Sequence, residues 1–392
     1  MEKRDREIQD ILNSLPTQSL NAVNRLRQMG REGVPALAIA LKYPDPIIRA
    51  GAARALARMN EPLGVPALAE AVNDPDSSVR LAAVLGLAAL PGPEAVQALA
   101  GALRAHYALV RDCAARALAS RSLVALRAAL EDPDPVVRAA AAHGVGYYAR
   151  DRASVPRLCE LLDDDSPDVR VMAVRALAWV ARRHRPVLSR LTAALSHPDE
   201  QVRLALVRAL GRVGDRAAAP ALAAMLQDSS RAVRLAAIRA LGAVDPEVPG
   251  GRAGAGDCRA IPALLEPLTG PDADLRLAAA EALAFILGRD PNGERDPRTV
   301  PLLLRALTDC DARVRAMAAT ALAEAGDPRA VAALTEVLHD PVWSVRASAA
   351  SALGAIGGAE AVPPLEAACS DEDLAVGSRA ELALQQVRAR LR

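Results

Sequence analysis

Residues 132–145 read DPDPVVRAAAAHGV, and the same pattern returns at residues 340–357 as DPVWSVRASAASALGAIG. In both stretches a turn rich in Asp leads into a segment in which an aliphatic residue precedes an arginine and alanines follow it. This arginine recurs ten times, mostly about 31 residues apart, with two longer separations of 42 and 39 residues: Arg49, Arg80, Arg111, Arg138, Arg170, Arg203, Arg234, Arg276, Arg315 and Arg346. A fixed period of this length predicts a protein built from stacked structural repeats.

Each repeat is predicted to contain two helices. The residue before the arginine is aliphatic in all ten repeats, and the third residue after it is alanine in nine of them. These offsets, with a small residue six positions after the arginine, lie on one stripe of a helix with 3.6 residues per turn. A shorter apolar segment precedes each such helix, as in VPALAIAL at residues 34–41, where proline occupies a first turn that tolerates it.

The turns between these helices carry a repeated acidic residue. An aspartate lies six residues before the arginine in six repeats: Asp74, Asp132, Asp164, Asp228, Asp309 and Asp340. A carboxylate at the start of a helix caps free backbone N–H groups and interacts favourably with the helix dipole. The same carboxylate is placed to meet an arginine of its own or a neighbouring repeat. We therefore predict that the repeated Asp and Arg residues serve the structure.

The composition restricts the class of protein. Hydrophobic residues make up 52% of the 392 residues and aromatic residues only 2%, so Ala, Leu and Val must fill the core. The net charge of +1 argues against a generally basic nucleic-acid-binding protein. Five cysteines without CxxC spacing favour neither a disulfide framework nor a zinc site, and no segment is typical of a signal peptide or a membrane span. We expect a cytoplasmic protein that does not bind membranes.

The two quoted stretches resemble the HEAT-like repeats named from phycobilisome lyases (PBS-lyase HEAT-like repeats), and the resemblance extends over about residues 34 to 392. It implies an all-α fold, a right-handed α-solenoid (α/α superhelix) of about eleven HEAT-like helix pairs. Solenoids of this kind serve as scaffolds, regulatory subunits, lyase subunits and a few enzymes, so the resemblance specifies the fold more than the function.

The departures from the period predict the organisation of the chain. Residues 1–33 are expected to form an irregular N-terminal cap, residues 34–370 the repeat solenoid, and residues 371–392 a C-terminal capping helix. Gly- and Pro-rich insertions near 245–259 and 288–299 follow the arginine helix of consecutive repeats and are expected to emerge along one edge.

A candidate binding surface follows from helix geometry. Positions five and nine residues after the repeat arginine lie opposite the core stripe, on the side that is commonly concave in a solenoid. In the first seven repeats this side is basic, with aromatic residues at its middle, which suits an acidic or amphipathic protein segment. The residues predicted to contact a partner are Arg54, Arg116, His143, Tyr147, Arg175, Trp179, Arg208, Arg212 and Arg239. Tyr147 and Trp179 occupy equivalent positions in consecutive repeats and are expected to be neighbours.

No motif predicts catalysis, a cofactor or a metal site. The five histidines never precede Glu, and neither HExxH nor GxSxG occurs. We therefore expect a non-catalytic scaffold or adaptor that binds another protein. Two other functions remain open: the resemblance implies a bilin lyase or chromophore-handling subunit, and arginines beside aromatic rings also suit nucleic acid. Two other interpretations of the surface also remain, a basic row that is only solvated and a binding site on the insertion edge.

Overall fold

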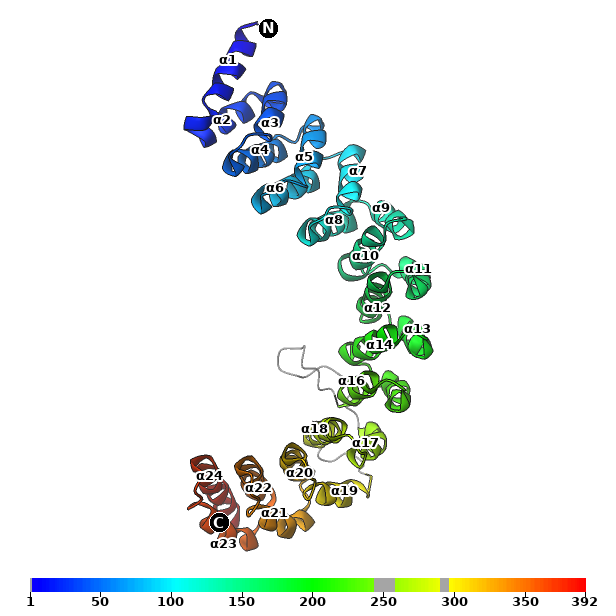
Figure 1. The fold of residues 1–392 in the computed structure, drawn as a ribbon, viewed down its shortest axis with the longest axis vertical. Coiled ribbons are helices and arrows are strands. Elements are labelled where there is room, and N and C mark those ends of the chain that lie inside the picture. Colours follow the sequence, from blue (N-terminus) through cyan, green and yellow to red (C-terminus); the bar gives the residue numbers. More distant parts are fainter. Residues whose placement is uncertain (1, 243–257, 290–295) are drawn as a thin grey trace. The chain divides into compact units, whose positions relative to one another are not determined.

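The computed structural model describes residues 2–242, 258–289 and 296–392, and the regular elements within these ranges are all helices. The chain divides into two compact units, Met1–Val187 and Leu188–Arg392. In each unit the helices follow one another as pairs, and the pairs stack in chain order (Figure 1). The fold is an all-α solenoid, as the sequence predicts.

The first unit contains six helix pairs among its described residues. The first helices are α1 (Glu2–Asn13), α3 (Val34–Ala40), α5 (Val65–Ala71), α7 (Pro93–Ala102), α9 (Leu123–Ala128) and α11 (Val155–Glu160). The second helices are α2 (Leu15–Gln28), α4 (Pro46–Met59), α6 (Ser77–Ala89), α8 (Ala108–Arg121), α10 (Pro135–His143) and α12 (Pro167–Ala181). Helix α10 continues directly into a π-helix, η4 (Gly144–Ala149). From α4 to α12, the second helices line the inner side of this unit (Figure 1).

The second unit is built in the same way. Its first helices are α13 (Pro186–Ala193), which begins at the boundary of the units, α15 (Ala219–Ala224), α17 (Ile261–Leu268), α19 (Thr299–Ala306), α21 (Val331–Val337) and α23 (Val362–Ala368). Its second helices are α14 (Glu200–Val213), α16 (Arg231–Leu241), α18 (Ala273–Arg289), α20 (Ala312–Ala325), α22 (Trp343–Ile356) and α24 (Leu374–Leu391). The insertions expected near 245–259 and 288–299 fall mostly on residues 243–257 and 290–295, which lie outside the described residues.

Small aliphatic side chains form the core between the helices. On α4, Ile48, Ala52 and Leu56 follow one another at intervals of four residues and are at most 2% exposed. Burial of each large aliphatic side chain stabilises the fold by about 1.5–3 kcal/mol. A Cβ atom added to Gly86, six residues after Arg80, would lie 3.0 Å from the side chain of Leu68, so the small residue lets neighbouring helices approach closely.

The N-terminal segment differs from the expected irregular cap. Residues 2–28 fold into the helices α1 and α2, and a 3-10 turn, η1 (Gly30–Gly33), leads to α3. Ile11, Leu15 and Leu26 are fully buried there, because α2 packs on α3 and α4 in the same way as the later pairs. The solenoid therefore has one more helix pair at this end than the repeat motif indicates.

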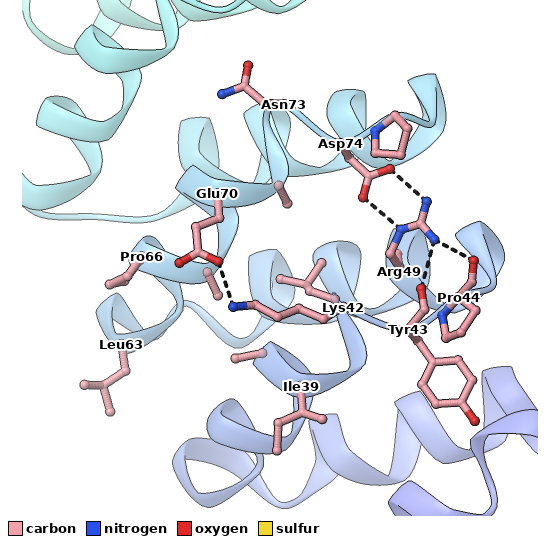
Figure 2. A pocket seen from close by; sticks show the side chains of 15 residues that line it. Ile39, Lys42, Tyr43, Pro44, Arg49, Leu63, Pro66, Glu70, Asn73 and Asp74 are labelled. Carbon is pink, nitrogen blue, oxygen red and sulfur yellow. Dashed lines mark hydrogen bonds and ion pairs between the residues drawn. The ribbon is translucent and has the colours of Figure 1, made fainter.

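A repeat arginine that faces an aspartate of the next repeat joins two turns, as Arg49 shows. Nε and Nη2 of Arg49 donate to the two carboxylate oxygens of Asp74 at 2.8 and 2.9 Å (Figure 2). Nη1 of the same guanidinium donates to the backbone carbonyls of Tyr43 and Pro44 at 2.9 and 2.7 Å. Asp74 also accepts from the backbone N–H of Asp76 at 2.8 Å. We call this arrangement, which joins the turns of consecutive repeats, the Arg–Asp clasp.

The clasp forms six times among the described residues. Its guanidinium side chains are only 9–14% exposed and its carboxylates 5–12%. Removing one partner of such a pair leaves an uncompensated charge away from water, which costs about 3–5 kcal/mol in fully buried cases. For these six pairs the predicted structural role is confirmed. The pairs are Arg49 with Asp74, Arg138 with Asp164, Arg203 with Asp228, Arg276 with Asp309, Arg315 with Asp340, and Arg346 with Asp371.

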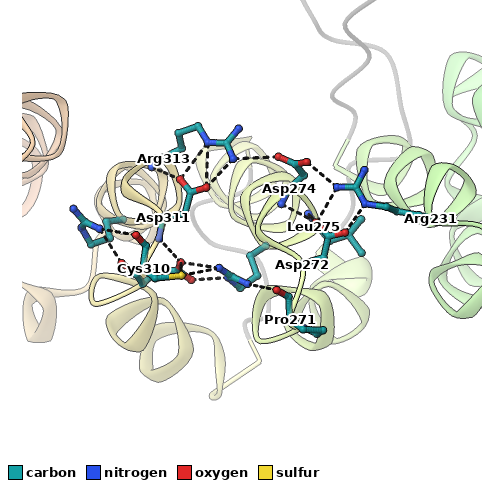
Figure 3. A network of polar contacts seen from close by, with 11 residues as sticks. Arg231, Pro271, Asp272, Asp274, Leu275, Cys310, Asp311 and Arg313 are labelled. Atoms are coloured by element: carbon teal, nitrogen blue, oxygen red, sulfur yellow. Dashed lines mark hydrogen bonds and ion pairs between the residues drawn. The ribbon is translucent and has the colours of Figure 1, made fainter.

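Repeats without the facing aspartate use other contacts. The guanidinium carbon of Arg80 lies 3.5 Å from the centre of the Tyr107 ring, a cation–π contact in place of the ion pair. The repeats of Arg234 and Arg276 have the longest separation. Here Arg231 of the first of these repeats contacts the second, because its Nη2 lies 2.7 Å from Asp274 (Figure 3). Asp274 also pairs with Arg313 at 3.1 Å, so charged groups link α16, α18 and α20.

Candidate partner-binding site

The predicted contact residues lie on the second helices of both units, except Tyr147, which lies in the π-helix η4. Four of the arginines are exposed, on α4, α8, α12 and α14, whereas Arg212 and Arg239 are half-buried. The first unit holds Arg54, Arg116, His143, Tyr147, Arg175 and Trp179, and the second unit holds Arg208, Arg212 and Arg239. The structure therefore brings together the aromatic members of the set in the first unit.

The rings of three predicted contact residues, His143, Tyr147 and Trp179, form one cluster. The ring centres of Tyr147 and Trp179 are 4.9 Å apart at an interplanar angle of 62°, which confirms that they are neighbours. His143 stacks on Tyr147 at 5.3 Å and 20°, and meets the edge of Trp179 at 5.2 Å. Aromatic pairs at these separations are worth about 0.5–1.5 kcal/mol beyond the area they bury. Tyr147 remains 44% exposed, so the cluster has a face open to solvent.

A π-helical turn positions the two tyrosines. In η4, a Cβ atom added to Gly146 would lie 2.4 Å from the Cα atom of Ala176, so only glycine admits α12 this close. The turn ends at Arg150, which adopts a left-handed conformation with φ of 51°. Because a π turn holds more residues than an α turn, it also brings Tyr148 into the cluster, 5.0 Å from Tyr147. Such turns are frequent at functional sites.

A carboxylate on the preceding repeat fixes this cluster. The hydroxyl of Tyr148 lies 2.8 and 2.9 Å from the two oxygens of Asp112 on α8, and Nε2 of His143 lies 3.1 Å from the first of them. Sequence reasoning missed both Asp112 and Tyr148. A signal for Asp112 was present, because the residue directly after the repeat arginine is Ala, Leu or Val in the nine other repeats.

The cluster is uncharged apart from Asp112 at neutral pH. Burial lowers the pKa of His143 although Asp112 acts to raise it, and the charge of Arg175 lowers it further. Burial and the hydrogen bond to Asp112 raise the pKa of Tyr148 to about 12. Histidine and tyrosine therefore stay neutral and act as hydrogen-bond donors to the carboxylate. The arrangement holds a rigid aromatic surface in place.

A groove of about 550 Å³ adjoins His143 and lies between α8, α10 and α12. Its floor is apolar, with Val136, Ala140 and Met172 among the lining residues, and Asp168 and Arg175 are among its charged ones. A larger pocket of about 760 Å³ lies beside α3 and α5, but the charged groups that line it pair with one another, as Lys42 and Glu70 do at 3.0 Å (Figure 2). The smaller groove is therefore the better candidate for a binding site.

Exposed arginines lie on the second helices of the first unit, on α4, α8 and α12, and directly after η4 and α12. They differ from the clasp arginines because none forms an ion pair with any described residue. Unpaired cations attract anionic partners and set the local potential of the surface. These residues are Arg54, Arg58, Arg116, Arg150, Arg175, Arg182 and Arg183.

Other kinds of site find no support in the part of the chain that the structure describes. No group of three or more His, Cys, Asp or Glu residues there is arranged to hold a metal ion. Among the same residues, no helix has both the length and the apolar character needed to cross a bilayer.

Solved structures of other solenoids resemble this chain. Kap121p bound to Nup53p is 14% identical with a TM-score of 0.61, and the match covers 99% of this chain and 49% of Kap121p. Importin beta in an ammonium sulfate condition is 16% identical with a TM-score of 0.54, and 99% and 63% of the two chains are covered. The chain thus spans about half the length of Kap121p. At these identities the likeness establishes the fold alone.

Sequence comparison gives the family. No curated protein matches the sequence significantly. The family model of HEAT repeats matches residues 34–119, 123–192, 188–284 and 299–385, which together make up most of the chain. The protein is therefore a member of the HEAT-repeat family.

Proposed function

We propose that this protein is a non-catalytic scaffold or adaptor that binds an acidic or amphipathic segment of a partner protein on the inner face of its first unit. The observation that supports this most is the aromatic cluster of Tyr147, Tyr148 and Trp179 among unpaired arginines. Tyr, Trp and Arg are the residues most enriched at the energetic centres of protein interfaces.

The distribution of aromatic residues strengthens this proposal. The chain has only seven Phe, Trp and Tyr residues, and three of them are in this one cluster. The core is filled by aliphatic side chains elsewhere, so packing alone does not require rings here. The same unit exposes Leu85 and Val136 by 43% and 42%, and both are on second helices. A partner with one apolar and one acidic face would complement this combination of side chains.

The second unit carries the other predicted contacts, Arg208, Arg212 and Arg239. They belong to the proposal as a separate basic patch of that unit, on α14 and α16. A solved complex of a similar solenoid, Kap121p bound to Nup53p, gives an example of a protein partner for this fold. Nucleic acid is the competing partner, because unpaired arginines and an exposed tyrosine also suit phosphates and bases.

The test begins with a peptide display selection on the immobilised full chain. Affinities of the selected peptides are then measured by fluorescence anisotropy for wild type, for Arg116→Glu/Arg175→Glu, and for Arg31→Glu/Arg190→Glu. The last variant is the control, because it makes the same charge change at two exposed arginines away from the second helices, Arg31 in η1 and Arg190 on α13. We expect the selection to yield peptides with acidic and apolar residues. Arg116→Glu/Arg175→Glu should bind them at least about tenfold more weakly than wild type, and Arg31→Glu/Arg190→Glu should bind them about as tightly as wild type.

Two results would contradict the proposal. One is that both double variants bind the selected peptides as wild type does. The other is that labelled single-stranded DNA binds more tightly than any peptide, with a steep linear decrease of log K against log salt concentration that flattens in Arg116→Glu/Arg175→Glu. That second result would establish nucleic acid as the partner of this face.

A further inference from the structure

The groove between α8, α10 and α12 has opposite charges at its two ends. Asp168 and Arg175 both line it from α12, seven residues apart, so they lie on one face of the helix about 10 Å apart along its axis. Val171 and Met172 lie between them and line the same groove. The order along the α12 wall of the groove is therefore acidic, apolar, basic.

Both end charges are available to a ligand. Asp168 and Arg175 are exposed, and neither forms an ion pair with any described residue. Asp112, which also lines the groove, differs from them because Tyr148 and His143 already donate hydrogen bonds to it. The α8 wall opposite α12 combines the small side chain of Ala115 with Asp112 and Arg111. Nη1 of Arg111 donates to the backbone carbonyls of Ala105 and His106, both at 2.8 Å.

The size of the groove limits what enters it. A volume of about 550 Å³ over a length of about 10 Å gives a cross-section of roughly 55 Å². A whole helix, with a diameter of about 10–12 Å, has a cross-section of roughly 80–110 Å² and is too large to enter. The side chains along one face of a helix are narrow enough to enter, while its backbone stays outside.

We propose that this groove binds one face of a two-turn amphipathic helix, with a basic residue opposite Asp168, an acidic residue opposite Arg175 and an apolar residue between them. The proposal rests on the proposed function and specifies the partner's charge order. On a helix, residues seven positions apart match the spacing of the two charged groups. An acidic residue at both ends of the segment would place one carboxylate against Asp168.

The test uses three alanine-rich helical peptides that share the same leucines on one face. At two positions seven residues apart on that face they carry Lys and Glu, Glu and Glu, or Lys and Lys. Wild type is expected to bind the Lys/Glu peptide about fivefold more tightly than either of the others, the effect of one exposed charge pair. Asp168→Lys should bind the Glu/Glu peptide more tightly than the Lys/Glu peptide, the reverse of wild type. Asp168→Asn should bind the Lys/Glu and Glu/Glu peptides equally.

Glu94→Lys is the matched control, because it makes the same charge change at an exposed site on α7, outside the groove. It should retain the wild-type order of affinities. Circular dichroism must show that the Asp168 variants keep the helix content of wild type. If Asp168→Lys fails to fold, the comparison of Asp168→Asn with wild type decides.

Two outcomes would overturn the inference. Wild type could bind the Glu/Glu peptide as tightly as the Lys/Glu peptide, or it could bind none of the three. In either case the proposed function stands as long as the display-selected peptides still lose affinity in Arg116→Glu/Arg175→Glu. Loss of that dependence as well would refute the proposed function itself.

Discussion

Removing one carboxylate of an Arg–Asp clasp should destabilise the solenoid locally and strongly. In the pair of Arg138 and Asp164, both Nε and Nη2 donate to the carboxylate at 2.7 Å, and the two side chains are 14% and 7% exposed. Asp164 also accepts from the backbone N–H of Ser166 at 2.9 Å. Asp164→Ala removes all three bonds and leaves a guanidinium that little water reaches.

The magnitude follows from the geometry of this pair. Each hydrogen bond to a charged group contributes about 1.5–3 kcal/mol, and breaking a buried ion pair costs about 3–5 kcal/mol. Because Arg138 is partly exposed and keeps its bonds to the carbonyls of Asp132 and Pro133, we expect the lower end, about 3 kcal/mol. This corresponds to about 100-fold faster amide exchange in α12 where local opening limits exchange.

Trp179 in α12 gives a local probe of this region once Trp343 is replaced by Phe. Urea unfolding followed by its fluorescence, together with hydrogen exchange of α10 to α12, measures the effect. Asp165→Ala is the matched control, since Asp165 is exposed and forms no ion pair with any described residue. The double variant Arg138→Met/Asp164→Leu should cost less than the sum of its single changes. If Asp164→Ala cost no more than Asp165→Ala, or if the single changes were additive, the clasp would not be the element that joins these repeats.

Glycine, aspartate and histidine residues each provide another test. Gly146→Ala should lower the free energy of unfolding by about 1–3 kcal/mol, because the added Cβ atom meets Ala176. Gly101→Ala is the control and should be neutral or stabilising, since nothing lies within 4 Å of its added Cβ atom. Equal effects of the two changes in thermal unfolding would contradict the close packing at η4. The hydrogen bonds from the clasp arginine, Arg203, lower the pKa of Asp228, so the stabilisation by this pair should be complete above about pH 4, near the unfolded pKa, and be lost as the pH falls through the lowered pKa of the folded state. Asp228→Asn should reduce this dependence of stability on pH, and an unchanged profile would refute the assignment. Burial lowers the pKa of His143 in the folded state, so the unfolded chain binds the proton at a higher pH than the folded chain does. The melting temperature should therefore decrease as the pH falls below about 6.5. His143→Phe should weaken this decrease, and an equal decrease in wild type and variant would contradict the reasoning.

The repeat pattern predicted most of the fold because each repeat contacts mainly its neighbours. Arg138 and Asp164 show this well: the arginine, the aspartate and their spacing are all visible in the sequence, and the pair forms as soon as two repeats stack. The helices α1 and α2 could not be predicted from this pattern, since they lack the repeat arginine.

The candidate site was predictable only in part. The helical angle of about 100° per residue placed His143, Tyr147 and Trp179 on one face, and the structure brings them together. The same arithmetic excluded Tyr148, because it assumes an α-helix and η4 is a π-helix. The π turn depends on how closely α12 approaches Gly146, which is a contact with the next repeat and not a property of the local sequence.

Arginine has two roles in this protein, and its neighbours decide which one applies. In the six clasps, a carboxylate and two backbone carbonyls surround each guanidinium, so these arginines add little to the surface potential. On the inner face of the first unit the arginines lack such partners, and their charge reaches solvent beside the exposed ring of Tyr147. A net charge of +1 for the whole chain is therefore compatible with a strongly basic local surface. Charge reversal at Arg116 or Arg175 should accordingly change binding, whereas the loss of Arg138 should change stability.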